Sequence, residues 1–265
     1  MRTAEYTSRT HVTNAHAVAT TAVARVLCRT GVTVGVWFWA IYLVYAVGII
    51  AGNGLAGNDL EISAFDSTLG SSRWPVLWLG AAVPAALLAT HLAAGGTRRS
   101  LFDGVVRGAL VVGAGFGAAT TIALLAERAL STSLGMTWRR LGALPFDGVA
   151  GVVSTLVAES LVVTTYVLVG AGIGFAYQRH GAARGTLASI PLFLPAVLVD
   201  VVTRTGVVGA IANVRFEPDI ENAVVPTAEG AVPMLVGIGG ALAAVVLAAA
   251  VLRYVGRDAP VNPPR

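Results

Sequence analysis

Long apolar runs dominate this sequence and limit what it can fold into. Six runs approach the roughly 20 helical residues that cross a hydrocarbon core about 30 Å thick. They cover residues 31–52, 74–94, 105–125, 149–177, 186–202 and 232–252. Because a backbone in lipid must satisfy its own hydrogen bonds, runs of this length predict helices. With 55% hydrophobic residues, 12% charged residues and a mean hydropathy of +0.75, they predict an all-α, polytopic membrane protein with six transmembrane helices.

Residue usage excludes several chemistries. All 18 basic residues are arginine, so neither a lysine-dependent phosphate-binding loop nor a lysine Schiff base can form. The single cysteine, Cys28, cannot form a disulfide within the chain, and the four histidines lack the HExxH spacing. We therefore expect no metal site, no catalytic centre and no cofactor bound by this chain.

The first 30 residues are polar and arginine-bearing, and they predict a cytosolic segment with an interfacial amphipathic helix. Its apolar residues recur at helical spacing on one face, at Ala15, Val18, Ala19, Ala22, Val23, Val26 and Leu27. Arg25 and Arg29 lie elsewhere on that helix, where they would face lipid headgroups. The alternative is a short soluble helix. The segment is too long for a signal-peptide n-region, so we expect it to be retained.

The distribution of arginine predicts the orientation, because cytoplasmic loops retain basic residues. With the N-terminus inside, the cytosolic segments hold twelve arginines and three acids, and the opposite segments hold six arginines and nine acids. Both termini are therefore predicted to be cytosolic, with the chain in the plasma membrane. The predicted organisation is a cytosolic segment at 1–30, a transmembrane domain at 31–252 and a cytosolic tail at 253–265.

Two glycine clusters lie inside predicted spans. They are Gly113, Gly115 and Gly117 in the third span, and Gly170, Gly172 and Gly174 in the fourth. Glycines four residues apart let helix backbones approach closely where lipid supplies no hydrophobic drive. We expect packing within the chain, with a dimer face as the alternative. A dinucleotide-binding motif is excluded because the glycines lie in apolar spans without a βαβ context.

Two acids also lie inside predicted spans, where an ionisable side chain is a functional hypothesis by default. Glu159 is about ten residues into the fourth span, roughly 15 Å deep at about 1.5 Å per residue. Either it lines a substrate or proton path, or it is hydrogen-bonded and fixes helix packing. Asp200 precedes Arg204 by four residues, and the two are predicted to pair on one helical face.

The outer connection at 203–231 contains an apolar stretch, 206–212, that is too short to span. It either dips into the outer leaflet, where protein satisfies its backbone, or packs as a surface loop.

Residues 92–110 form a short charged turn between the second and third predicted spans. Thr97 or Ser100 can cap a short helix there, with Asp103 in capping-box position after Ser100. Two adjacent arginines would face headgroups or an acidic partner. A turn that only connected two spans would have no use for the exposed Leu-Phe pair that follows, so this turn is predicted to dock on a partner.

Together these features resemble the membrane subunit of a type 2 ABC exporter, especially the short actinobacterial permeases. The resemblance rests on six spans with both ends inside, an interfacial N-terminal helix, a GTRRSLFDG turn at 96–104 and a long outer segment before the sixth span. It also rests on ALLAERAL at 123–130 with Trp138 downstream, and on YQRHGAARG at 177–185 as a second cytosolic turn. It covers nearly the whole chain.

The resemblance implies that the turn is a coupling helix seated in a groove of a separate ATP-binding subunit. The residues in the family pattern are Thr97, Arg98, Arg99, Ser100, Leu101 and Phe102. It also implies that ATP and Mg are bound by that partner, and that a homodimer or a second permease completes the transporter. ATP closure would then lever the turn and switch the side that the permeases face. We expect contact with membrane lipid and no nucleic acid.

Few fixed charges in the spans favour an amphiphilic or hydrophobic substrate over a small hydrophilic ion. An ion-coupled secondary carrier is one alternative, although it would be expected to contain more intramembrane acids and basic partners. A non-transporting scaffold or sensor subunit is another, because it would share the fold without needing the coupling turn. A membrane enzyme is disfavoured by the lack of paired acids, a histidine motif or an activated nucleophile.

Overall fold

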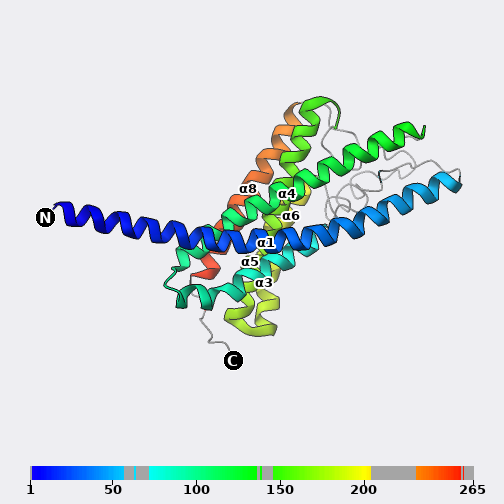
Figure 1. The fold of residues 1–265 in the computed structure, drawn as a ribbon. Helices are drawn as coiled ribbons and strands as arrows, with labels where there is room; N and C mark the ends of the chain where they lie inside the picture. The colour runs from blue at the N-terminus through cyan, green and yellow to red at the C-terminus, as the bar shows by residue number, and fades with distance from the viewer. Residues whose placement is uncertain are drawn as a thin grey trace.

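The computed structural model of the chain describes residues 2–56, 63, 72–135, 138, 146–203, 231–257 and 259. Within this part of the chain the elements are α-helices, and no strand occurs. They are α1 (Arg2–Ala56), α3 (Arg73–Ala93), α4 (Arg98–Ser133), α5 (Gly148–Leu192), α6 (Leu194–Thr203) and α8 (Ala231–Gly256) (Figure 1). The predicted all-α class is confirmed.

Five helical segments among the described residues are long and apolar enough to cross a membrane. They are Asn14–Ala56, Arg73–Ala93, Arg98–Ser133, Gly148–Thr203 and Met234–Gly256. This result is consistent with a membrane protein. Its count differs from the predicted six because the fourth and fifth predicted runs fall within one segment.

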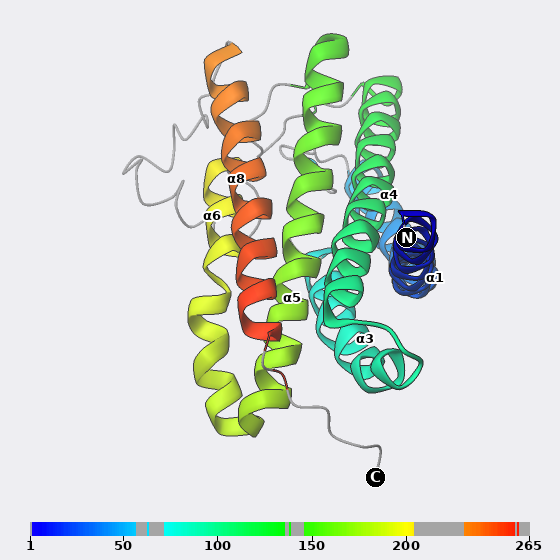
Figure 2. The same ribbon diagram turned by 90° about the vertical axis from the view of Figure 1, so that its left-hand side faces the viewer.

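The segment that contains α5 and α6 reverses direction at Gly181. The backbone there has a φ of 72°, which glycine adopts without steric cost. Beside the reversal, the hydroxyls of Tyr177 and Thr186 lie 2.9 Å apart. Further from it, the Tyr166 hydroxyl of α5 donates to Asp200 of α6 at 2.9 Å. The two arms therefore lie side by side, as Figure 2 shows.

Helix α5 forms the centre of the bundle. Nearly all its side chains between residues 161 and 176 are buried, which is the pattern of a helix enclosed on all sides. It packs against α3, α4, α6 and α8. By contrast, α1 runs obliquely along α4, and its N-terminal part extends beyond the other helices (Figure 1).

Close contacts at glycines hold α5 against its neighbours. A Cβ added to Gly113 or Gly117 of α4 would lie 2.1 and 2.3 Å from hydroxyl oxygens of α5. A Cβ added to Gly170 or Gly174 of α5 would lie 2.1 and 2.2 Å from backbone carbonyl oxygens of α3. The middle glycine of each cluster faces open space. The predicted packing within the chain is thus confirmed for the outer pair of each cluster.

The predicted interfacial helix is not a separate element, because α1 passes from it into the first span without a break at residue 30. Only part of the predicted apolar face packs against the bundle. Val23 and Leu27 are buried, but Val18 of the same predicted face is 70% exposed. Gly104 and Gly108 of α4 explain the difference, since α1 approaches the α4 backbone where these glycines lack side chains.

Candidate functional site

The turn between α3 and α4 holds the residues predicted to couple to a partner. Gly95 reverses the chain with a φ of 83°, and Thr97 caps α4. The Thr97 hydroxyl accepts from the Ser100 backbone N–H at 3.1 Å, and the Ser100 hydroxyl accepts from the Thr97 backbone N–H at 3.0 Å. This reciprocal capping box uses Ser100 where the sequence suggested Asp103. The predicted coupling helix is not a separate element, because the capped turn begins the 36-residue α4 directly.

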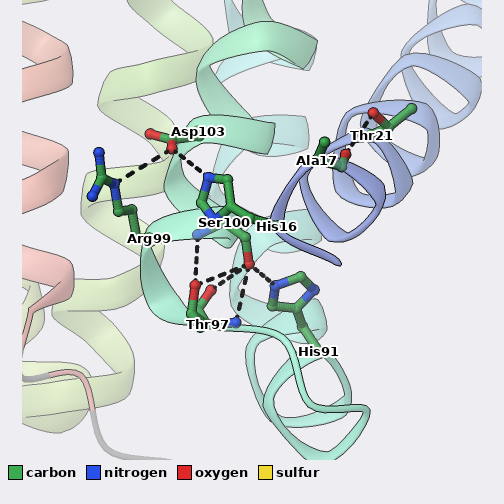
Figure 3. A network of polar contacts seen from close by, with 8 residues as sticks. All are labelled: His16, Ala17, Thr21, His91, Thr97, Arg99, Ser100 and Asp103. Atoms are coloured by element: carbon green, nitrogen blue, oxygen red, sulfur yellow. Dashed lines mark hydrogen bonds and ion pairs between the residues drawn. The ribbon is translucent and has the colours of Figure 1, made fainter. Parts of the chain in front are cut away.

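Side chains from three helices meet at this turn (Figure 3). His16 of α1 places its Nε2 atom 3.1 Å from Oδ2 of Asp103 in α4, and Nε of Arg99 lies 4.0 Å from the same oxygen. His91, near the end of α3, places its Nε2 atom 2.9 Å from the Ser100 hydroxyl. Asp103 therefore ties α4 to α1 instead of closing the capping box.

Arg98 joins the turn to a fourth helix. Its guanidinium donates to the backbone carbonyl of Gly256 at 3.3 Å and to that of Arg257 at 2.6 Å. These carbonyls lie at the C-terminus of α8, where a helix leaves acceptors unsatisfied and a cation is favourable. The start of α4 and the end of α8 are thereby held together.

Leu101 and Phe102 lie inside the bundle, so the expectation of an exposed Leu-Phe pair is wrong. Leu101 is 0% exposed and Phe102 is 6% exposed. The Phe102 ring meets that of Phe175 in α5 edge to face, with centroids 5.8 Å apart, and it fills the space beside Gly256. Phe102 therefore packs α4 against α5 and α8, and Leu101 lies in the same buried core. Of residues 97–102, Thr97 and Arg99 are the exposed ones, and the Arg99 side chain is 74% exposed.

The end of the bundle that contains this turn is strongly basic. The α3–α4 turn, the Gly181 reversal and the end of α8 all lie there (Figure 2). The arginines on these elements are Arg98, Arg99, Arg107, Arg179, Arg184, Arg253 and Arg257, and Asp103 is the acid described among them. These arginines are among those that the sequence assigned to the cytosolic side.

A second cluster of charged and polar groups lies in the middle of the bundle. The Arg73 guanidinium at the start of α3 forms an ion pair with Asp200 of α6, and both side chains are only 2% exposed. Tyr166 of α5 donates to the other carboxylate oxygen, and the arginine also lies over its ring, 5.6 Å from the centroid. Glu159, 4% exposed, lies close enough to interact electrostatically with Arg73.

The sequence predicted Arg204 as the partner of Asp200. The structure pairs Asp200 with Arg73, 127 residues away in the sequence, while Arg204 lies outside the described residues and its pairing stays a prediction. The structure also brings together Glu159 and Asp200, which the sequence treated separately. The sequence did contain a signal for this cluster: both acids lie in apolar runs that hold no arginine, so a cationic partner had to come from elsewhere in the chain.

At the opposite end of α4, the ALLAERAL stretch holds two charged residues with different surroundings. The Glu127 carboxylate is 2% exposed and accepts a hydrogen bond from the hydroxyl of Ser63. Arg128 pairs with Asp147 at 3.0 Å and lies over the Trp138 ring, 5.6 Å from its centroid. The downstream tryptophan therefore contacts this stretch. The apolar stretch at 206–212 lies outside the described residues.

Within the described part of the chain, no group of three or more His, Cys, Asp or Glu side chains is arranged to hold a metal ion. No protein-family model matches the chain, and neither the curated proteins nor the solved structures compared with it give a significant match. The functional conclusion therefore depends on the geometry of the two clusters.

Proposed function

We propose that this chain is the membrane-spanning permease subunit of an ABC exporter, driven by a separate ATP-binding subunit that docks on the α3–α4 turn. The observation that carries the proposal is the way the turn is built. It leaves Thr97 and Arg99 on the surface, while Asp103, Ser100 and Arg98 bond to α1, α3 and the end of α8. A partner that moved this surface would therefore move several spanning helices together.

The burial of Leu101 and Phe102 changes the expected form of docking. The contact with the partner would be made by the exposed, cationic Arg99 instead of by the apolar pair. The matching surface on the ATP-binding subunit should therefore be acidic. Force would be transmitted through the buried Phe102 ring to α5 and α8. ATP and Mg would be bound by the partner, and this chain would supply the path and a shape with two states.

We further propose that the Gly148–Thr203 segment crosses the membrane twice, which gives six crossings with both termini in the cytosol. The reversal at Gly181 supports this proposal. The chain would lie in the plasma membrane, with the basic end of the bundle facing the cytosol. Six crossings form half of a transporter, so a second copy or a second permease would complete it.

The crossing count can be tested with an impermeant thiol reagent on intact cells, in a Cys28→Ala background. We expect a cysteine at Ser133, an exposed residue at one end of α4, to react from outside. A cysteine at Ala182, exposed beside the reversal, should react only after permeabilisation. Reaction of both positions from the same side would contradict the second crossing.

The docking proposal is tested by purifying the tagged chain from its native membrane in mild detergent and identifying the proteins that remain bound. We expect an ABC ATPase whose recovery, and whose activity in reconstituted vesicles, falls severalfold with Arg99→Glu. Arg184→Glu is the matched control, because it makes the same charge change at an exposed site on the other turn. Equal losses for both variants, or the absence of any ATPase, would remove the basis for the proposal.

A second candidate, an ion-coupled secondary carrier, is favoured by the central cluster. A carrier needs intramembrane acids with basic partners, and Arg73, Asp200 and Glu159 provide one base and two acids within the bundle. Transport that depends on an imposed proton or sodium gradient and proceeds without ATP would select this candidate. Transport that requires a co-purified ATPase would select the exporter.

A further inference from the structure

A groove of about 510 Å³ lies between α4 and α8 at the basic end of the bundle. It is distinct from the docking surface formed by Thr97 and Arg99. The groove is lined by Phe102, Asp103, Val106, Arg107, Ala249, Ala250, Leu252 and Arg253. Most of this lining is apolar, and the charged groups are three.

The charges of the groove favour an anion. Arg107 and Arg253 are exposed, and neither forms an ion pair with another described residue. The carboxylate of Asp103 is engaged elsewhere, 3.1 Å from His16 and 4.0 Å from Arg99. Two guanidinium groups that have no carboxylate partner among the described residues therefore line one small site, and guanidinium geometry suits the oxygens of a phosphate.

The position of the groove along its helices favours a lipid. Arg253 follows the predicted apolar run 232–252 directly, and Arg107 lies near the start of the run 105–125. Both arginines are thus at the ends of apolar stretches, the level at which headgroups are found. Val106, Ala249 and Ala250 line the wall, and Ala250 is exposed on the outside of the bundle, where an acyl chain could lie against it.

We propose that this groove binds one anionic phospholipid, with its phosphate held by Arg107 and Arg253 and an acyl chain along Val106, Ala249 and Ala250. Basic pockets between spanning helices are suited to this class of headgroup. The bound lipid would bridge α4 and α8 beside the contact that Arg98 makes with the end of α8. The inference requires only that the chain lies in a membrane, and it holds whether or not an ATPase drives it.

The test is binding of phosphatidylglycerol to the purified, delipidated full chain in detergent, followed by native mass spectrometry, with phosphatidylcholine as the neutral comparison. We expect retention of one phosphatidylglycerol in preference to phosphatidylcholine. Each of Arg107→Gln and Arg253→Gln should weaken its binding about fivefold, and both together about 25-fold, from the typical contribution of one basic residue near an anionic lipid surface. Arg184→Gln removes the same charge away from the groove and should leave binding unchanged.

Ala250→Trp tests the apolar wall without changing charge, and this exposed position tolerates a larger side chain. It should also weaken phosphatidylglycerol binding, while thermal unfolding of each variant checks that the chain remains folded. Three outcomes would overturn the proposal. Phosphatidylcholine could bind as well as phosphatidylglycerol, or Arg184→Gln could weaken binding as much as the groove variants do. The third outcome is that inorganic phosphate competes with phosphatidylglycerol while Ala250→Trp has no effect. A disulfide between two copies carrying Ala250→Cys in a Cys28→Ala background would show that a second copy occupies the groove instead.

Discussion

The central ion pair gives the sharpest prediction about stability. Replacing Arg73 with Met removes the guanidinium from a site that is 2% exposed and leaves the Asp200 carboxylate, also 2% exposed, with the Tyr166 hydroxyl at 2.9 Å. Breaking a buried pair in this way typically costs about 3–5 kcal/mol, because a buried charge is left uncompensated. A pair on the surface contributes only about 0–1 kcal/mol, so burial decides the magnitude.

The assay is thermal unfolding of the purified chain in one detergent. At roughly 2–4 °C per kcal/mol for a chain of about this size, Arg73→Met should lower Tm by about 6–20 °C. Asp200→Asn in the same chain should restore part of that loss, because the amide keeps an acceptor for Tyr166 and carries no charge. Restoration should be incomplete, since Glu159 also interacts with Arg73.

Asp147→Asn is the matched control for this experiment. Asp147 also pairs with an arginine, at 3.0 Å, but its side chain is 86% exposed, and it makes no capping hydrogen bond. Its Tm should therefore change by no more than about 2–4 °C, as expected for a surface ion pair. The reasoning would be refuted if Arg73→Met matched this control, or if the double variant were as unstable as the sum of its two single variants.

Two further predictions separate packing from docking and use the same unfolding assay. Gly170→Ala should destabilise the chain by about 1–3 kcal/mol through overpacking, because its Cβ would lie 2.1 Å from a carbonyl oxygen of α3. Gly172→Ala is the control and should be neutral or stabilising, because a Cβ there meets open space. Equal effects of the two substitutions would contradict the packing role of Gly170. Phe102→Ala should cost about 3–5 kcal/mol of stability in the isolated chain because it empties a buried site. Arg99→Ala should change stability by about 0.5 kcal/mol or less, because the Arg99 side chain is 74% exposed. A larger loss with Arg99→Ala than with Phe102→Ala would place Phe102 outside the core.

The sequence predicted the features that depend on local chemistry. Apolar runs predicted spanning helices because lipid forces each backbone to bond within its own helix. Glycines four residues apart predicted close helix contacts. The outer glycines of each cluster, which have this spacing, make those contacts, whereas Gly115 and Gly172 between them do not. Thr97 was available as a cap because its hydroxyl can reach the N–H three residues on.

The features that depend on distant neighbours could not be predicted in the same way. Arg204 was predicted as the partner of Asp200 because a spacing of four is visible in the sequence. Arg73, with which the structure pairs Asp200, becomes adjacent only when α3 and α6 pack on α5. Leu101 and Phe102 were expected to face a partner. An apolar side in the sequence indicates that something covers it, but not whether the cover is a partner or another helix of the same chain. In this chain the covering surface belongs to the bundle itself: Phe102 packs against α5 and α8, and Leu101 lies in the same core.

The two clusters are connected by α4, and this connection bears on the proposed mechanism. The helix begins at the exposed turn and continues for 36 residues without proline, so it can move as a rigid body. Further along, Gly113 and Gly117 bring its backbone against Ser160 and Thr164 of α5, and Thr164 donates to the carbonyl of Ala109 at 3.3 Å. Ser160 is the neighbour of Glu159. Because the two backbones are in close contact at these glycines and the interior is tightly packed, we expect a shift imposed at the turn to displace the part of α5 that contributes Glu159 and Tyr166 to the central cluster.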